Sequence, residues 1–311
     1  MVLVALVRER MLRTVYNYFI LNLALADLSV GLVIMPLSAT YVAFGNWPFG
    51  SAMCVLWVLM DFGCRQVSIF TLLLIAGDRY CSIRWPTTYV ARRTAQRTIP
   101  VVVLTWAVAV TIWAPGVASS LASDAEQCML KPSSNIAFTV TSAMLSYHLP
   151  VVSIVALYSR MTVLLIRKMK TKHAKRKIVP LDMPNSISKV SGQADEVLPG
   201  TSDPSCSHSH RINRQERREI RAVRTLAVVS VVFLVCWLPF ITMYLVTAAC
   251  PACVSSTAYN VSYWLAYINS SLNPIVYSLL SPEFRKAFKK VLRIGSRATS
   301  QVGRQSTLQA G

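Results

Sequence analysis

The sequence predicts an all-α membrane protein built as a seven-transmembrane helix bundle. Hydrophobic residues make up 54% of the chain and charged residues only 14%, whereas about a quarter of the residues in a soluble domain are charged. The apolar residues also gather into long segments that reach the roughly 20 residues needed to cross a bilayer. Because lipid cannot satisfy backbone hydrogen bonds, segments of this length are expected to be helices.

One short and six full apolar segments account for the seven helices. Residues 1–7 are apolar but too few to span, and we interpret them as the stub of a truncated first helix. After the last segment, Ser281-Pro282 is followed by Phe284, Phe288 and Leu292 on one helical face, which predicts a short amphipathic C-terminal helix on the membrane surface. The six full segments run approximately over 15–44, 52–83, 98–121, 136–166, 221–249 and 257–280.

The net charge of +19 is unevenly distributed among the connectors. Connectors 45–53 and 250–256 contain no charged residue, whereas arginine and lysine concentrate in 8–13, 84–97, 167–177 and 285–293. This alternation follows the positive-inside rule, so we expect a multi-pass plasma-membrane protein whose basic connectors and C-terminus are cytoplasmic. Confinement of the basic residues to connectors and tail predicts the lipid bilayer, and not nucleic acid, as a partner.

Charged residues at membrane depth are costly, and each one predicts a function. Asp27 lies within the first full segment, while Asp61 and Arg65 lie within the second, which ends in Asp78-Arg79-Tyr80. The 18 residues from Asp61 to Arg79 make five helical turns. Both side chains are therefore expected on one face of the helix, about 27 Å apart along its axis.

Several short motifs occur in a fixed order along the chain. They are Leu-Ala-Leu-Ala-Asp27, Trp47, Cys54, Asp78-Arg79-Tyr80, Trp106, Pro150 with Tyr158, Cys236-Trp237-Leu238-Pro239 and Asn273-Pro274-Ile-Val-Tyr277. With these motifs the chain resembles the rhodopsin-like G-protein-coupled receptors from its start to about residue 293, apart from the long connector after residue 166.

The resemblance implies a domain organisation and a class of function. Residues 1–293 would form the receptor domain, with 178–210 a disordered third intracellular loop and 294–311 a cytoplasmic tail. The expected protein partners are a heterotrimeric G protein, arrestin and receptor kinases. An enzyme is not expected, because no nucleophile–base–orienter set or Gly-rich phosphate loop is present. A transporter or channel is disfavoured, since the sequence has neither repeated halves nor broken spans.

The resemblance also implies an activation switch at the cytoplasmic boundary. Arg79, flanked by Asp78 and Tyr80, would pair with Glu219 in an ionic latch. An exposed ion pair contributes only about 0–1 kcal/mol, so the latch would bias an equilibrium rather than lock it. On activation Arg79 would turn toward Tyr158 and Tyr277.

Two disulfides are expected on the outer side. Cys54 and Cys128 both lie on this oxidising side, and in the family this bond ties the second outer loop to the third helix. Cys250 and Cys253 are close in sequence, and a small loop disulfide is favoured because zinc would need further ligands.

Five polar residues at mid-depth match the sodium site of the family, and hard cations prefer oxygen ligands. The alternative is a hydrated polar network without an ion, and no other cofactor is expected. The five residues are Asp27, Ser68, Asn269, Ser270 and Asn273.

Asp61 matches the carboxylate that binds the protonated amine in the aminergic branch of the family. Aromatic residues near it would cage an alkylammonium ion through cation–π contacts. The stretches 86–94 and 263–270 look most like the muscarinic acetylcholine receptors. The predicted ligand-binding residues are Asp61, Phe62, Arg65, Ser142, Ser146, Trp237, Phe240, Ile241, Tyr263, Trp264 and Tyr267.

Some of these residues depart from the muscarinic pattern. Ile241 stands where that group has asparagine, and Ser142 and Ser146 resemble serines that bind catechol or phenol hydroxyls. Arg65 replaces a small residue one turn below Asp61, where it would pair with Asp61, point toward the polar centre or bind an anionic group of the ligand. The predicted ligand is a small amine or ammonium compound, muscarinic-like; the alternatives are histamine or another biogenic amine, and a divergent orphan receptor without an amine ligand.

Overall fold

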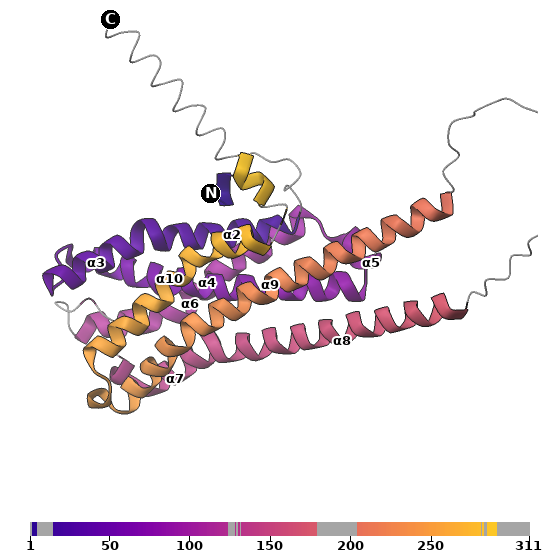
Figure 1. The fold of residues 1–311 in the computed structure, drawn as a ribbon. Coiled ribbons are helices and arrows are strands. Elements are labelled where there is room, and N and C mark those ends of the chain that lie inside the picture. Colours follow the sequence, from indigo (N-terminus) through magenta and orange to yellow (C-terminus); the bar gives the residue numbers. More distant parts are fainter. Residues whose placement is uncertain are drawn as a thin grey trace, which may run out of the picture.

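The computed structural model describes residues 2–4, 15–123, 128, 130, 132–178, 204–280, 282 and 285–290. Their side chains are included except at 120–123, 134, 172–178, 204–219, 222 and 277. Every regular element in this part of the chain is helical, as predicted (Figure 1). Five helices in it are long and apolar enough to cross a membrane, namely 17–44, 50–84, 95–119, 136–171 and 223–249.

The helices follow the predicted order, and two spans each contain a π-helical segment. The elements are α2 (Asn17–Ser29), η2 (Val30–Ile34), α3 (Met35–Phe44), α4 (Gly50–Arg84), α5 (Thr88–Arg92), α6 (Ala95–Ser123), η3 (Pro132–Ser134), α7 (Ile136–Ala143), η4 (Met144–His148), α8 (Leu149–Ile178), α9 (Pro204–Ala249), η5 (Pro251–Cys253) and α10 (Ser256–Leu280). The segments α2–η2–α3 and α7–η4–α8 each form one continuous span.

Helix α4 is the central helix of the bundle. It packs against α2, α6, α8 and α9, and 72% of its membrane window is buried, compared with 17–44% in the other four spans. The charged residues predicted at membrane depth in this helix therefore lie inside protein rather than in lipid, as the cost of exposing a charge to lipid requires.

A polar contact among three spans fixes α2 and α6 on α4. The Asn22 amide donates to the Thr71 hydroxyl at 2.8 Å and accepts from the Trp106 indole at 2.9 Å. Asn22 is 2% exposed and Thr71 is fully buried. Hydrogen bonds of this kind hold transmembrane helices together, because the alternative is an unsatisfied polar group in hydrocarbon.

Each π-helical segment lies in the turn before a proline. Pro36 and Pro150 are the second residues after η2 and η4, and a proline removes one helical N–H and crowds the carbonyl four residues earlier. Neighbouring groups bind the carbonyls that such a widened turn leaves free. The Trp57 indole donates to the Ile34 carbonyl at 3.3 Å, and His148 Nδ1 lies 3.1 Å from the Ala143 carbonyl.

Several helix ends differ from the predicted ones. Helices α8 and α9 extend beyond the apolar segments, to Ile178 and from Pro204. Residues 204–210, predicted as part of a disordered loop, are therefore helical, since adding a turn to an existing helix avoids the cost of nucleation. Residues 179–203, the predicted tail at 294–311 and residues 5–14 of the first helical region lie outside the described residues.

The predicted surface helix after α10 is described in part. Residues 285–290 are helical, and the Arg285 guanidinium donates to the Ser278 and Leu279 carbonyls at 3.0 and 2.6 Å. Phe288 is 6% exposed and packs with the main core. Phe284 and Leu292 lie outside the described residues.

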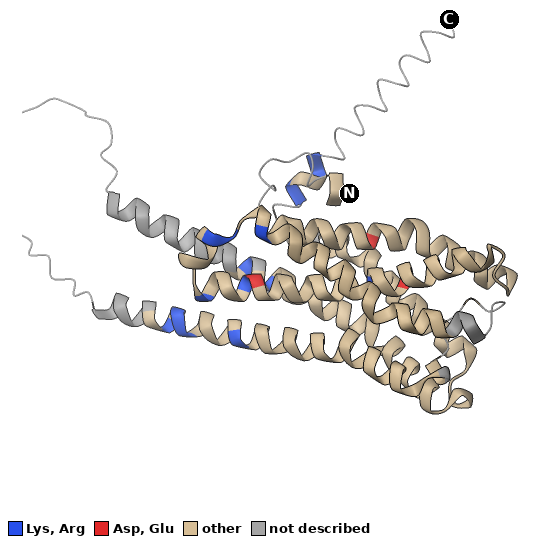
Figure 2. Ribbon diagram, turned by 180° about the vertical axis from the view of Figure 1, so that it is seen from behind, with Lys and Arg blue, Asp and Glu red and all other residues tan. Residues whose placement is uncertain are grey.

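The two ends of the bundle differ in charge. Lysine and arginine gather at the end where α8 and α9 extend from the bundle, and acidic residues are few (Figure 2). We call this end the basic end. The start of α4 and the connection between α9 and α10, which carry the two disulfides, lie at the opposite end, which we call the disulfide end (Figure 1).

Candidate functional site

A buried network of Asp61, Arg65 and Tyr263 forms the centre of the candidate ligand site. Arg65 Nη2 pairs with Asp61 Oδ2, and the two side chains are 4% and 1% exposed. The Tyr263 hydroxyl donates to Asp61 Oδ2 and accepts from Arg65 Nη2 at 2.7 Å. Arg65 Nε also donates to the Asp61 carbonyl at 3.0 Å. The sequence left three orientations open for the Arg65 side chain. In the structure this side chain pairs with Asp61.

Two polar atoms of this network remain without a partner. Within the described residues, Asp61 Oδ1 accepts no hydrogen bond and Arg65 Nη1 donates none, although both atoms are buried. We call these two atoms the open pair. A buried charged group with an unused hydrogen-bonding atom is costly, so the open pair is a place where a ligand or water would gain binding energy.

Five aromatic rings surround the Arg65 guanidinium. Their centres lie between 4.5 and 5.4 Å from its central carbon, within the range of cation–π attraction. The rings come from α4, α9 and α10, so a single cation is held by three helices. They belong to Phe62, Trp237, Phe240, Tyr263 and Tyr267.

Two cavities adjoin the network. The inner one has a volume of about 20 Å³ and is lined by Arg65 together with Phe62, Phe240 and residues of α6, η4 and α9. The outer one has a volume of about 230 Å³ and reaches Tyr263 from the disulfide end. It is lined by Ser38, Tyr41, Val42, Gly45, Trp57, Val58, Phe62, Leu130, Tyr259, Asn260, Tyr263 and Trp264.

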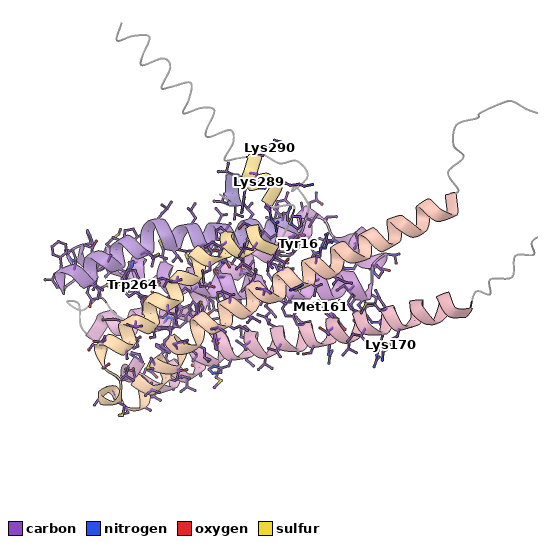
Figure 3. The ribbon with its side chains drawn as sticks, in the orientation of Figure 1. Tyr16, Met161, Lys170, Trp264, Lys289 and Lys290 are labelled. Carbon is purple, nitrogen blue, oxygen red and sulfur yellow. A yellow bond between two sulfur atoms is a disulfide. The ribbon has the colours of Figure 1, made fainter. Side chains whose placement is uncertain are left out.

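Three of the four remaining predicted ligand residues line these cavities. Ile241 and Ser146 line the inner cavity, and Trp264 lines the outer one, in the half of the bundle toward the disulfide end (Figure 3). Ser142 is buried, donates to the Thr139 carbonyl at 3.1 Å, and is not among the residues that line either of these two cavities.

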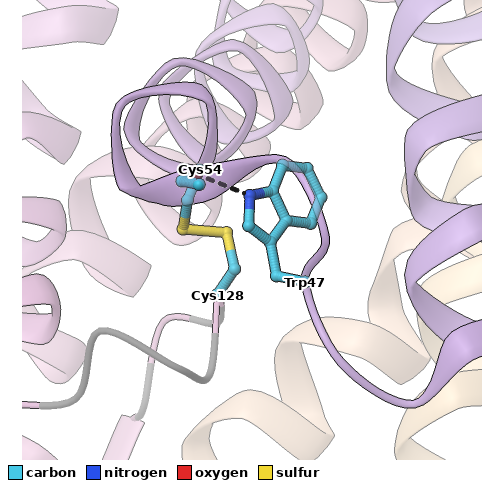
Figure 4. Close-up of a disulfide and its surroundings, with 4 residues drawn as sticks. Trp47, Cys54 and Cys128 are labelled. Carbon is cyan, nitrogen blue, oxygen red and sulfur yellow. Dashed lines mark hydrogen bonds between the residues drawn. A yellow bond between two sulfur atoms is a disulfide. The ribbon is translucent and has the colours of Figure 1, made fainter.

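Both expected disulfides are present at the disulfide end. Cys54 at the start of α4 is joined to Cys128, with their Cα atoms 5.6 Å apart, and Cys250 is joined to Cys253. The Trp47 indole lies next to the first disulfide and donates to the Gly50 carbonyl at 2.9 Å (Figure 4). The first disulfide holds the segment that contains Leu130, a lining residue of the outer cavity, against the start of α4.

The predicted sodium ligands provide acceptor oxygens in the interior. Asn273 donates to Asp27 Oδ2 at 2.7 Å, and the Ser68 hydroxyl donates to the Cys64 carbonyl at 3.0 Å. In the part of the chain that the structure describes, Asp27 Oδ1 and Asn269 Oδ1 are buried and accept no hydrogen bond. Two buried acceptors without a donor are groups that a cation would satisfy, and hard cations such as sodium prefer oxygen ligands.

At the basic end, Asp78 is bound to two arginines and one tyrosine. Arg93 Nη1 lies 3.0 and 2.8 Å from the two carboxylate oxygens, and Arg79 Nη2 lies 3.5 Å from Oδ2. The Tyr89 hydroxyl donates to Asp78 at 3.0 Å. Burial and the nearby Asp78 charge raise the pKa of Tyr89, so its hydroxyl keeps the proton that it donates.

The other switch residues occupy separate contacts. Arg79 stacks on the ring of Tyr16, 3.6 Å from its centre, at the basic end (Figure 3). The Tyr158 hydroxyl lies 3.3 Å from the Ser230 hydroxyl of α9, and the ring of Tyr80 lies near Trp85. The side chains of Glu219 and Tyr277 lie outside the described residues, so the latch stays a prediction.

Sequence reasoning missed several residues of these sites. Tyr16, Tyr89 and Arg93 bind the Asp78-Arg79-Tyr80 motif, and Trp57 lines the outer cavity. Tyr89 lies in the stretch 86–94 that carried part of the resemblance, but it is 11 positions after Asp78 and on a separate helix, so no helical spacing marked it as a partner of that carboxylate. Tyr16 comes from a distant span and carries no such local signal.

These features define an integral-membrane helix bundle with a buried charged site beneath a cavity at one end and a paired Asp-Arg motif at the other. The family described as 7 transmembrane receptor (rhodopsin family) matches residues 1–277. The chain belongs to this family and is a multi-pass G-protein-coupled receptor rather than an enzyme.

Individual relatives are similar over nearly the whole chain. It is 31% identical to the Probable G-protein coupled receptor No18 of Amphibalanus amphitrite, over 96% of this chain and 86% of that protein. It is also 31% identical to the 5-hydroxytryptamine receptor 1B of Equus caballus, over 94% and 81%, and to the Alpha-1A adrenergic receptor of Oryzias latipes, over 94% and 63%. The predicted closeness to muscarinic and histamine receptors stays a prediction.

Proposed function

We propose that this receptor binds a small ligand with an ammonium group at Asp61 and reports the binding to a heterotrimeric G protein. The observation that supports this most directly is the cation already held there, because the Arg65 guanidinium pairs with Asp61 inside five aromatic rings. Ring faces gathered around the cation that pairs with a carboxylate are an arrangement that also stabilises an alkylammonium ion. A buried carboxylate also needs a positively charged partner.

The ligand class we propose is that of biogenic amines and acetylcholine-like ammonium compounds. Two relatives are named as a 5-hydroxytryptamine receptor and an adrenergic receptor, which supports an aromatic amine. The resemblance of the sequence to muscarinic receptors supports a quaternary ammonium ion. Ser146, which lines the inner cavity, has a hydroxyl without a hydrogen-bond partner among the described residues, and a phenol or catechol group would reach it only if this cavity of about 20 Å³ widened on binding.

A second candidate is a receptor without an amine ligand, in which Asp61 and Arg65 are only a structural pair. The observation that favours it is the pairing itself, since Arg65 occupies the carboxylate that an amine would need. The two candidates differ in one measurable property, the dependence of ligand binding on Asp61.

For the opposite end we propose that the basic end faces the cytoplasm of a plasma-membrane receptor, where it contacts the G protein, arrestin and receptor kinases. The excess of lysine and arginine there supports this orientation. The predicted latch would hold Arg79 near Glu219 in the inactive state. Glu219→Lys should then raise basal G-protein activation, measured as nucleotide exchange without ligand. An unchanged basal level would contradict the proposed latch.

We also propose that sodium binds among the five oxygen-bearing residues around Asp27. The two buried acceptors without a donor in the described interior, Asp27 Oδ1 and Asn269 Oδ1, support this. When bound, the ion would supply the positive charge that Asp27 lacks there. Asn273 would orient the carboxylate through its 2.7 Å hydrogen bond.

Competition binding and G-protein activation, measured on the wild type, Asp61→Asn and Arg65→Ser, test the ligand proposal. The panel contains acetylcholine, histamine, serotonin, noradrenaline and the parent amino acids of the last three. We expect at least one compound to bind the wild type or Arg65→Ser, and Asp61→Asn to weaken that binding at least 100-fold. If none binds either receptor at normal surface expression, the second candidate replaces the first.

A further inference from the structure

The open pair offers one acceptor and one donor on the two partners of a single buried ion pair. In the part of the chain that is described, Asp61 Oδ1 and Arg65 Nη1 are the buried atoms of this network without a hydrogen bond. Their side chains are 1% and 4% exposed, so bulk water does not compensate them. A ligand that brings one donor and one acceptor would satisfy both atoms at once.

The charge of the site favours a ligand that carries both signs. Asp61 and Arg65 cancel each other, so the site is neutral before a ligand enters. A compound with an ammonium group alone is attracted by Asp61 but repelled by Arg65 at similar range. A zwitterion keeps the site neutral, and its carboxylate matches the planar hydrogen-bonding edge of a guanidinium.

The available space places this ligand on the side of Tyr263. The inner cavity, at about 20 Å³, has room for roughly one water molecule. The outer cavity, at about 230 Å³, has room for a small molecule and is lined by Tyr263, whose hydroxyl binds both Asp61 and Arg65; these two residues lie behind Tyr263 and are not among the lining residues. A ligand entering from the disulfide end therefore meets Tyr263 first and would displace its hydroxyl from the ion pair.

We propose that Arg65 is a specificity-determining residue that makes the pocket select small zwitterions of the amino-acid class over simple amines. The ligand's ammonium group binds Asp61 Oδ1, and its carboxylate binds Arg65 Nη1. Its side chain remains in the outer cavity, against the rings of Trp57, Tyr259 and Trp264 that line this space. This inference rests on the proposed function, because it keeps Asp61 as the group that binds ammonium.

Matched pairs of an amine and its parent amino acid test the proposal. The pairs are serotonin with 5-hydroxytryptophan, histamine with histidine, and tyramine with tyrosine, each in competition binding and G-protein activation. The receptors are the wild type, Arg65→Ser, Arg65→Lys and Arg84→Ser. The last is the matched control, because it removes the same charge from an exposed position at the basic end of α4.

We expect the wild type to bind the amino acid of at least one pair at least tenfold more tightly than its amine. Arg65→Ser should reverse this preference, by improving the amine at least tenfold and weakening the amino acid at least tenfold. Arg65→Lys should keep the wild-type preference in reduced form, because it keeps the positive charge, and Arg84→Ser should leave it unchanged. Surface expression and the unfolding midpoint of each receptor establish that it is folded.

Four results would overturn the proposal. If the wild type prefers the amine in every pair, or Arg65→Ser leaves the ratio unchanged, Arg65 does not select the ligand, while binding at Asp61 stands. If Arg65→Ser binds amines and the wild type binds neither member of any pair, Arg65 closes the amine site without selecting a zwitterion. If no compound binds either folded receptor, the proposed function fails together with this inference.

Discussion

The ion pair at the centre of the bundle predicts a strong energetic coupling between Asp61 and Arg65. The perturbations are Asp61→Asn, Arg65→Gln and the double variant, which remove the charges; asparagine keeps the shape of aspartate, and glutamine keeps the aliphatic stem of arginine with a polar end. Each single variant leaves one buried charge without its partner, since the two side chains are only 1% and 4% exposed. The double variant removes both charges and leaves none uncompensated.

The expected magnitude follows from these contacts. Removing one member of a buried ion pair typically costs about 3–5 kcal/mol. In Asp61→Asn, cation–π attraction between Arg65 and the five rings would offset about 0.5–2 kcal/mol of this loss in stability. In Arg65→Gln, the Tyr263 hydroxyl still donates to Asp61. We therefore expect each single variant to lose about 2–3 kcal/mol, and the double variant to lose no more than either single one, giving a coupling energy of about 2–3 kcal/mol.

The assay is thermal unfolding of the purified, ligand-free receptor in detergent at one fixed scan rate. At about 2 °C per kcal/mol for a chain of this size, each single variant should lower the midpoint by about 5 °C. Arg84→Gln is the control, because a change at an exposed charge is usually within about 0.5 kcal/mol. Additive losses, with a coupling energy below about 0.5 kcal/mol, would refute the reasoning that the two charges stabilise each other.

Three further predictions concern the scaffold. Cys54→Ser should cost about 4 kcal/mol and Cys250→Ser about 2 kcal/mol or less, because the bridged residues are 74 and 3 positions apart; equal shifts of the non-reducing unfolding midpoint would contradict this. Trp106→Phe removes a 2.9 Å hydrogen bond to the buried amide of Asn22 and should cost about 1–3 kcal/mol, measured in the same assay; an unchanged midpoint would show that this bond does not stabilise the bundle. Arg93→Gln removes two hydrogen bonds to the Asp78 carboxylate, which is 2% exposed. It should therefore cost about 1–2 kcal/mol of stability and speed amide hydrogen exchange in Thr88–Arg92. Normal protection of these amides would show that Arg93 does not anchor this helix.

The spans were predictable from hydropathy, but the helix ends were not. Hydropathy identifies the part of a helix that lies in lipid, and the six predicted segments correspond to the helices from α2 to α10. Helices α8 and α9 continue into polar sequence, where the apolar pattern stops although the helix does not. A polar extension of a long helix needs no new nucleus, so composition alone gives no sign of where it ends.

The candidate site was predictable as a set of residues but not as a set of contacts. The i,i+4 spacing allowed Asp61 and Arg65 to pair, but it also allowed two other orientations. The orientation in the structure is stabilised by Tyr263, 198 positions from Arg65, and by rings from three helices. Such contacts between distant segments have no local sequence signal. The same holds for the stacking of Tyr16 on Arg79.

The two serines predicted to face the ligand show the effect of the π-helical segment. Ser142 and Ser146 are one α-helical turn apart in sequence, which predicts a shared face. Because η4 begins at Met144, the turn that contains Ser146 holds more residues than an α-helical turn. Ser146 lines the inner cavity, whereas Ser142 instead binds the Thr139 carbonyl.

The π-helical segments η2 and η4 also change which residues are structurally equivalent when two receptors are aligned. Each widened turn holds one residue more than an α-helical turn of the same height. In a relative with a regular α-helix at this place, equivalent residues would align without a gap on one side of the segment. On the other side the alignment would be shifted by one residue. Residues 136–143 and 35–44, which form the disulfide-end parts of two spans, are best equated with those of a relative by superposition in space, since ungapped alignment would assign them to the wrong faces.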